Sequence, residues 1–212
     1  MTKILIGCEC SGRIRRAFRG RGFDAYSCDL KPAEDLHRLD PYHIQGDVMD
    51  AIRCLPQTDM WDLIILHPEC TAMALSGNKH YAEGMPKHQK RIHAIKWTID
   101  LWNLACKHSR RVALENPASV IFPYLRKLGA RTQFLHPHHF GHPEFKATGF
   151  ALHGLPELVH TNPLKVPERG TEMYKEWEKV FRMAPSPERA TERSRTYLGI
   201  ADAIAEQWGA VL

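Results

Sequence analysis

The stretch "WDLIILHPEC", residues 61–70, decides the fold class. Its centre, residues 63–66, is an unbroken run of Leu and Ile, which is typical of a strand buried on both faces of a parallel sheet. The run then gives way to His67, Pro68 and a polar loop that ends in a thiol. The stretch therefore predicts a central strand whose carboxyl end opens into a loop with side chains capable of chemistry.

Apolar runs of strand length alternate with amphipathic stretches of helix length along the rest of the chain. This alternation predicts an α/β fold, a mostly parallel sheet with helices on both faces. The expected strands cover residues 3–7, 23–30, 42–48, 61–66, 110–117 and 147–156, and the expected helices cover 11–22, 88–107 and 198–209. On the long helix, one apolar face is expected to pack against the core, formed by Ile92, Ile95, Ile99 and Trp102.

The length of 212 residues and the 43% hydrophobic fraction fit one domain over residues 1–212. Residues 156–195 hold several prolines and many charges, and we expect a surface excursion there. No stretch has the roughly 20 apolar residues of a membrane span, so we expect a cytoplasmic protein with six reduced cysteines. The net charge of +5 allows a polyanionic partner but does not establish one.

Four strand ends or adjoining loops carry polar or nucleophilic side chains, namely Asp29, Asp47, Cys70 and Glu115. Because ligands bind at the carboxyl ends of parallel strands, we expect these side chains to border one crevice. Asp29 is placed to accept hydrogen bonds from two ribose hydroxyls, or is a solvated loop residue. Asp47 either binds the amine of an adenine or caps the following helix. The first loop, "GCECSG" (7–12), lacks the GxGxxG spacing of a standard NAD site.

Cys70 is either an inert core thiol or a nucleophile. Glu115 follows three apolar residues and precedes Asn116 and Pro117, so a buried carboxylate there needs a partner or a crevice. A thiolate and a carboxylate in one pocket suit covalent addition to an electron-poor ring, with the acid holding or protonating a ring nitrogen.

These segments resemble the DNA cytosine C5-methyltransferases. "HPEC" (67–70) and "ALENP" (113–117) resemble the two catalytic loops of the family, and "ILIGCECSG" (4–12) occupies the place of the cofactor-binding loop. "HPEFKATGFAL" (142–152) resembles the strand with the Gln-x-Arg-x-Arg pattern. "PSPERATERSRTYLGIADAIAEQWG" (185–209) resembles the ending of small phage-encoded members, which lack a full target-recognition domain. The order of the segments is the specific signal.

The resemblance implies a Rossmann-like class I fold that uses S-adenosylmethionine and needs no metal. Cys70 would attack C6 of cytosine, Glu115 would bind N3 and the exocyclic amine, and C5 would accept the methyl group. The implied cofactor-binding residues are Gly7, Cys10, Ser11, Gly12, Asp29, Asp47, Val48, His67 and Pro68. Around the substrate the implied residues are Asn116, Pro117, Lys146 and Thr148.

Two groups of basic residues are further candidates for substrate contact. Lys87, Lys90 and Arg91 either contact phosphates or form a solvated helix face. Arg193 and Arg195 either replace a recognition region or lie in a solvated linker. The histidines of "HPHHFGHPE" (136–144) match no closed zinc pattern, so we expect no metal there.

The chain also departs from the family pattern. Glu69 stands where a second proline is usual, and Glu144, Lys146 and Thr148 stand at the Gln-x-Arg-x-Arg positions. The space before the last helix is too short for an ordinary recognition domain, so we expect weak DNA specificity or a protein partner that recognises the target.

Three alternatives remain open. The first is the same chemistry on a free cytosine nucleotide, and the second is a catalytically inactive DNA-binding or inhibitory homologue. The third is an amino-group methyltransferase, which Cys70 disfavours because an aromatic residue is usual there. A phage origin would place the protein in a bacterial host cell.

Overall fold

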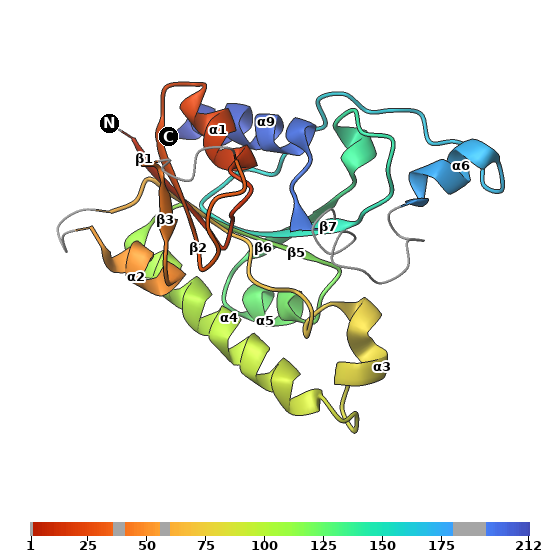
Figure 1. Cartoon of the computed structure of the whole chain (residues 1–212), viewed down its shortest axis with the longest axis horizontal. Helices are drawn as coiled ribbons and strands as arrows, with labels where there is room; N and C mark the ends of the chain where they lie inside the picture. The colour runs from red at the N-terminus through yellow and green to blue at the C-terminus, as the bar shows by residue number, and fades with distance from the viewer. Residues whose placement is uncertain (1, 36–40, 56–59, 180–193) are drawn as a thin grey trace.

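The computed structural model describes residues 2–35, 41–55, 60–179 and 194–212. Seven strands form one sheet in the order β3-β2-β1-β4-β5-β7-β6 (Figure 1). The strands are β1 (Lys3–Gly7), β2 (Asp24–Asp29), β3 (His43–Gln45), β4 (Leu63–Leu66), β5 (Val112–Pro117), β6 (Arg131–Leu135) and β7 (Thr148–His153). Strands β1 to β5 run parallel, and β7 lies antiparallel between β5 and β6. The predicted mostly parallel sheet is confirmed.

Helices cover both faces of this sheet, as predicted (Figure 1). The α-helices are α1 (Arg13–Arg19), α2 (Val48–Arg53), α3 (Asn78–Tyr81), α4 (His88–His108), α5 (Ile121–Lys127), α6 (Glu172–Trp177) and α9 (Leu198–Gln207). Short 3-10 turns are η1 (Leu75–Gly77), η2 (Pro137–His139) and η3 (Gly209–Val211). Helices α1 and α9 pack on one face, and α2, α4 and α5 pack on the other.

Apart from Lys3 at the start of β1, the central strands β1 and β4 are apolar because both of their faces are buried. Along β1, Ile4 and Ile6 belong to the core beneath α1 and α9, whereas Leu5 belongs to the core beneath α2 and α4. Along β4, Leu63 and Ile64 divide in the same way. Successive side chains of a strand point to opposite faces, so an unbroken apolar run is what two helical layers require.

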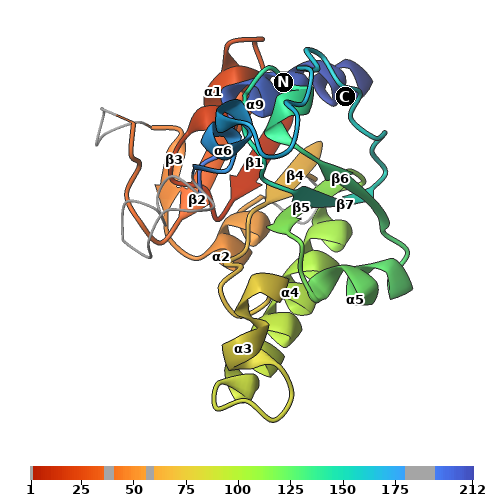
Figure 2. The same ribbon diagram turned by 90° about the vertical axis from the view of Figure 1, so that its right-hand side faces the viewer.

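The long helix α4 differs from its prediction at one position. Ile95 and Trp102 are buried as expected, but Ile92 is 43% exposed, so its assignment to the core was wrong. The physical reason is visible in Figure 2, where α3 and the adjoining part of α4 project beyond the edge of the helical layer. Ile92 lies in this projecting part, one turn after the helix begins at His88.

Strand β6 and helices α5 and α6 were not predicted from the sequence. Helix α6 lies within the expected surface excursion, where most residues between 156 and 176 are exposed but Leu158 and Trp177 are buried. Residues 180–193 lie outside the described part of the chain. All six cysteines are free of disulfide bonds in the structure. Within the described ranges, no helix is both long enough and apolar enough to cross a membrane.

Candidate active site

A cavity of about 820 Å³ opens at the carboxyl ends of β1, β2 and β4. The strand order reverses here, since the chain goes from β1 to β2 on one side and later returns to β4 on the other. Such switch points are where open α/β sheets bind ligands. Six of the residues predicted for the cofactor line the cavity, namely Cys10, Ser11, Asp29, Asp47, Val48 and His67.

The other three predicted cofactor residues lie behind the cavity wall. A Cβ atom at Gly7 would overlap the Val48 side chain and approach Leu66 Cδ2 to 2.9 Å, so glycine lets these elements pack closely. Gly12 has a φ of 67°, a left-handed conformation that glycine adopts readily, and it precedes α1. Pro68 is buried, and its carbonyl accepts a hydrogen bond from β5.

Among the described residues, five carboxylates line the cavity, namely Glu9, Asp29, Glu34, Asp47 and Glu69. Three of these, Glu9, Asp29 and Asp47, lie at or just after the ends of strands β1, β2 and β3. Asp29 accepts a hydrogen bond from the Lys31 backbone N–H through Oδ1 (2.9 Å). Asp47 Oδ1 accepts a hydrogen bond from the Met49 backbone N–H (2.7 Å). Asp47 therefore caps α2, which was one of the two roles that the sequence allowed for it. Glu9 was missed in the sequence. It is only 6% exposed, and within the described ranges of the chain its buried Oε2 has no hydrogen-bond partner.

The place of Glu9 in the first loop was the signal that could have identified it. Its Oε1 accepts hydrogen bonds from the Ser11 hydroxyl and from the Arg13 backbone N–H (3.1 Å). A buried carboxylate oxygen without a partner is costly, because burial disfavours an unpaired charge. Together the three carboxylates suit a ligand that carries hydroxyl and ammonium groups.

The buried thiols of the chain are poorly suited to act as nucleophiles. Burial raises the pKa of Cys8 and Cys28 to about 12 each, and Asp29 adds to both shifts. Burial likewise raises the pKa of Cys10 to about 12 and of Cys106 to about 11. Because the thiolate is the nucleophile, these four thiols are inert near neutral pH.

The loop after β4 is held against the loop after β5. Asn116 Nδ2 donates to the Pro68 carbonyl (3.1 Å), and the Ser119 hydroxyl donates to the Met73 carbonyl (3.1 Å). Half-buried Cys70 begins a turn in which its carbonyl accepts from the backbone N–H of Met73 (2.9 Å) and of Ala74 (2.8 Å). Cys70 itself is not among the residues that line the large cavity, although its neighbours Glu69 and Ala72 are.

Glu115 contacts His67 at the end of the adjacent strand. His67 Nδ1 lies 3.3 Å from Glu115 Oε2, and the two side chains are 9% and 19% exposed. Burial by itself raises the pKa of Glu115, but the hydrogen bond and charge of His67, with the charge of Lys146, outweigh burial and lower it below its ordinary value. Glu115 is therefore ionised at neutral pH.

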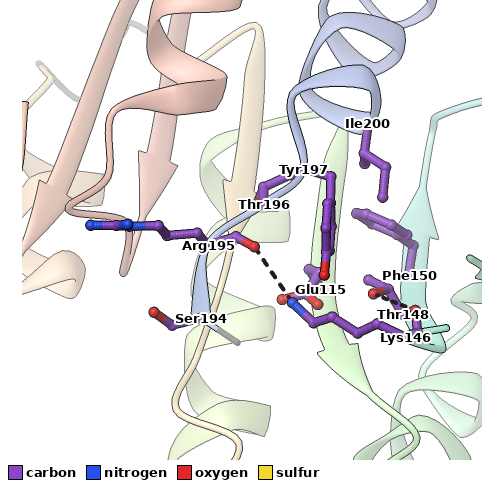
Figure 3. A pocket seen from close by; sticks show the side chains of 9 residues that line it. All are labelled: Glu115, Lys146, Thr148, Phe150, Ser194, Arg195, Thr196, Tyr197 and Ile200. Atoms are coloured by element: carbon purple, nitrogen blue, oxygen red, sulfur yellow. Dashed lines mark hydrogen bonds between the residues drawn. The ribbon is translucent and has the colours of Figure 1, made fainter. Parts of the chain in front are cut away.

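A second, small pocket of about 10 Å³ lies beside Glu115 (Figure 3). Lys146, Thr148 and Arg195, all predicted near the substrate, line it. Lys146 points toward Glu115 and donates to the Arg195 carbonyl (3.5 Å). The Arg195 side chain points away from Glu115, and its Nε pairs with Glu34 Oε2 (2.9 Å). Such a pocket has room for about one water molecule.

Arg91 corrects another prediction. It was expected to contact phosphate or lie on a solvated face, but it is only 6% exposed. Its Nε donates to the Ala72 carbonyl (2.7 Å), its Nη2 to the Ala74 carbonyl (3.3 Å) and its Nη1 to Asn78 Oδ1 (2.8 Å). Arg91 therefore braces the loop that carries Cys70.

Replacing Arg91 with methionine should destabilise the chain by about 1–3 kcal/mol, because two carbonyls lose a buried donor. The measurement is the free energy of unfolding in urea. Lys96→Met, at an exposed position of the same helix, should change it by less than about 0.5 kcal/mol. Equal effects of the two substitutions would contradict a bracing role.

The remaining predicted basic residues lie elsewhere. Lys87 and Lys90 are exposed where α4 begins, in the part of the molecule that projects with α3 (Figure 2). Arg193 lies outside the described residues. Pro117 ends β5 and pairs with Thr148 of β7.

The histidines after β6 form a cluster of rings in contact, of which His139 and His160 are stacked. The ring centroids of His139 and His160 are 3.8 Å apart, and those of His138 and His139 are 4.5 Å apart. Burial, followed by the charges of the neighbouring histidines, lowers the pKa of His139 to about 4. In the described part of the chain, no three His, Cys, Asp or Glu side chains are arranged to hold a metal ion.

Acid should destabilise the chain through this cluster. The pKa of His139 is lower in the folded chain (about 4) than its ordinary value (6.5), so its contribution to stability is complete above pH 6.5 and is lost as the pH falls to 4. His139→Gln should therefore lose less stability than the wild type over this range, measured by urea unfolding. The exposed His153→Gln is the control, and parallel losses in wild type and H139Q would refute the effect.

Comparison with known proteins gives a fold but no closer relative. No protein-family model and no curated protein matches the sequence. Among solved structures, the methyltransferase EhMeth of Entamoeba histolytica has a TM-score of 0.50 at 13% identity, covering 78% of this chain and 58% of that chain. The Dnmt2 methyltransferase of S. pombe has a TM-score of 0.46 at 15% identity, covering 74% and 51%.

The chain spans little more than half the length of these two proteins. At such identity the likeness concerns the fold, and the strand order and the place of the cavity agree with it. The chain has a Rossmann-like α/β fold that is similar to the fold of the methyltransferase EhMeth.

Proposed function

We propose that this chain transfers a methyl group from S-adenosylmethionine to C5 of cytosine in DNA. One observation carries the proposal. The neighbouring strands β4 and β5 bring the Cys70 loop and Glu115 to the same edge of the sheet, directly beside the large cavity. A nucleophile, an acid and a cofactor-sized cavity are the parts that this chemistry needs.

The cavity residues fit S-adenosylmethionine. A volume of about 820 Å³ lies within the range of small-molecule sites. The buried, unpaired Oε2 of Glu9 would accept a hydrogen bond from the ammonium group of the cofactor, and Asp29 would accept from the ribose hydroxyls. Bound there, the cofactor supplies an electrophilic methyl group.

The residues of the chain would carry the remaining steps. The Cys70 thiolate forms a bond to C6 of cytosine, which makes C5 nucleophilic while Glu115 holds N3 and the exocyclic amine. After methylation, C5 loses its proton to a base, the C6–S bond breaks, and Cys70 leaves as a thiolate. Asn116 keeps the Cys70 loop in register with Glu115 through its bond to the Pro68 carbonyl.

Access for the base requires a change in the small pocket. About 10 Å³ beside Glu115 does not accommodate a pyrimidine, so residues 194–197 would move outward when the base enters. A base in a duplex would first be flipped out, at a cost of a few kcal/mol. Exposed Lys87 and Lys90 on the projecting part of the molecule favour a DNA backbone over a free nucleotide. A protein partner would supply target recognition.

The test is transfer of labelled methyl from S-adenosylmethionine to duplex DNA, single-stranded DNA and free cytosine nucleotides in parallel. DNA containing 5-fluorocytosine should trap a covalent complex, because a base can remove a proton from C5 but cannot remove a fluorine atom there. Label in DNA together with a trapped complex is the expected result. Label only in the nucleotide would mean that the enzyme methylates free cytosine nucleotides and not DNA. No label in any substrate would favour a catalytically inactive binding protein.

A further inference from the structure

We infer that His67 supplies the proton that Glu115 passes to the cytosine ring, and that it takes the proton back when the product is released. This inference rests on the proposed function and adds a residue to it. Sequence reasoning placed His67 only at the cofactor. The structure places it between the cofactor cavity and Glu115.

The position of His67 is fixed by the sheet. Leu66 of β4 pairs with Leu114 of β5, so the next residues of the two strands, His67 and Glu115, are also neighbours. The His67 backbone N–H donates to the Gly7 carbonyl (2.9 Å), which ties the residue to β1 as well. The 3.3 Å contact between Nδ1 and Oε2 therefore follows from the register of three strands.

The second ring nitrogen of His67 is unsatisfied. Nε2 is buried and has no hydrogen-bond partner among the residues that the structure describes, although buried polar atoms nearly always have one. His67 also lines the large cavity. A ligand or water in this cavity would complete the hydrogen bonding of Nε2. The imidazole of His67 would then bind that molecule through Nε2 and Glu115 through Nδ1.

The charges around Glu115 explain why a second proton carrier is needed. The opposing charges of His67 and Lys146 keep Glu115 ionised at neutral pH. A carboxylate accepts hydrogen bonds but has no proton to donate. When Cys70 adds to C6, negative charge accumulates on the ring and N3 takes up a proton. Glu115 alone cannot supply that proton.

His67 completes the proton balance. The protonated imidazole gives its Nδ1 proton to Glu115, and Glu115 gives a proton to N3 as the C6–S bond forms. When the C6–S bond breaks, the N3 proton returns to Glu115 and from there to His67 Nδ1. Histidine is suited to this exchange because its charge changes between about pH 5 and 8.

Charged groups from several elements lie around His67. Glu115 on β5 contacts it, Glu69 follows it in the same loop, and Lys146 ahead of β7 acts on the charge of Glu115. Across the cavity, Glu9 and Asp29 add negative charge from the β1 loop and β2. Carboxylates outnumber the single ammonium group among these five residues.

The first experiment compares His67→Asn with His153→Asn, a control at an exposed histidine that lines neither pocket. His67→Asn should lower kcat by about 10²-fold or more and keep binding of labelled cofactor. The wild-type rate should fall as the pH rises from about 6 to 8, and this fall should be absent in H67N. Unchanged kcat and pH profile in H67N would overturn the inference while methyl transfer stands.

A second experiment needs no activity. The imidazole resonances of His67 are followed by NMR against pH in the wild type and in Glu115→Gln. Because a carboxylate stabilises the protonated ring, the midpoint should differ between the two proteins. Identical midpoints would overturn the inference. If no substrate is methylated but the midpoints differ, the proposed function fails and the coupling of His67 to Glu115 remains.

Discussion

Replacing Cys70 with alanine should abolish methyl transfer and leave S-adenosylmethionine binding unchanged. Without the sulfur atom no covalent bond to C6 forms, and C5 of an unactivated cytosine is a poor nucleophile. Binding should persist because Cys70 does not line the large cavity. The measurements are transfer of labelled methyl to DNA and titration of the cofactor by calorimetry.

A matched substitution separates chemistry from the general loss of a thiol. Cys54→Ala removes an exposed cysteine near the end of α2 and should retain full activity. Only the protein with Cys70 should form a stable complex with DNA that contains 5-fluorocytosine. Methylation by C70A at a rate near that of the wild type would exclude the covalent mechanism, and Cys70 would then be a packing residue.

The fold could be predicted where a strand is buried on both faces. Residues 63–66 have no polar side chain that would obscure the apolar pattern, and the same holds for residues 4–7. Strand β6 was missed because it lies at the sheet edge, where Phe134 is 47% exposed and the strand has a partner on one side only. Ile92 was misplaced because periodicity shows which residues share a helix face, but not how far the helix extends beyond the core.

The candidate site was predictable to the extent that strand ends define it. Asp29 and Asp47 end or follow strands, and they line one cavity as that rule implies. Arg91 shows the limit, since a basic residue on a helix gives no sign that backbone carbonyls will surround it. The contact between His67 and Glu115 depends on β4 and β5 being neighbours in register, and the sequence contains no direct record of that pairing.

Replacing Glu115 with glutamine should lower the rate of methyl transfer by about 10²–10⁴-fold, the usual range for losing a general acid or base. Glutamine keeps the size and one acceptor oxygen, so the change removes the charge and the exchangeable proton with little effect on packing. Cofactor affinity should stay constant, because Glu115 lines the small pocket and not the large one.

The size of the loss also separates two roles of Glu115. If Glu115 only orients the base through a hydrogen bond, the glutamine amide replaces it, and the loss should be below about 10-fold. If Glu115 moves a proton, glutamine fails and the larger loss follows at every pH tested. Single-turnover rates with saturating DNA measure this step directly, with exposed Glu157→Gln as the control. Among the residues that the structure describes, Glu115 is the one carboxylate that contacts His67 by a hydrogen bond. A large loss of rate in E115Q and a matching loss in H67N would therefore identify one proton path through both residues.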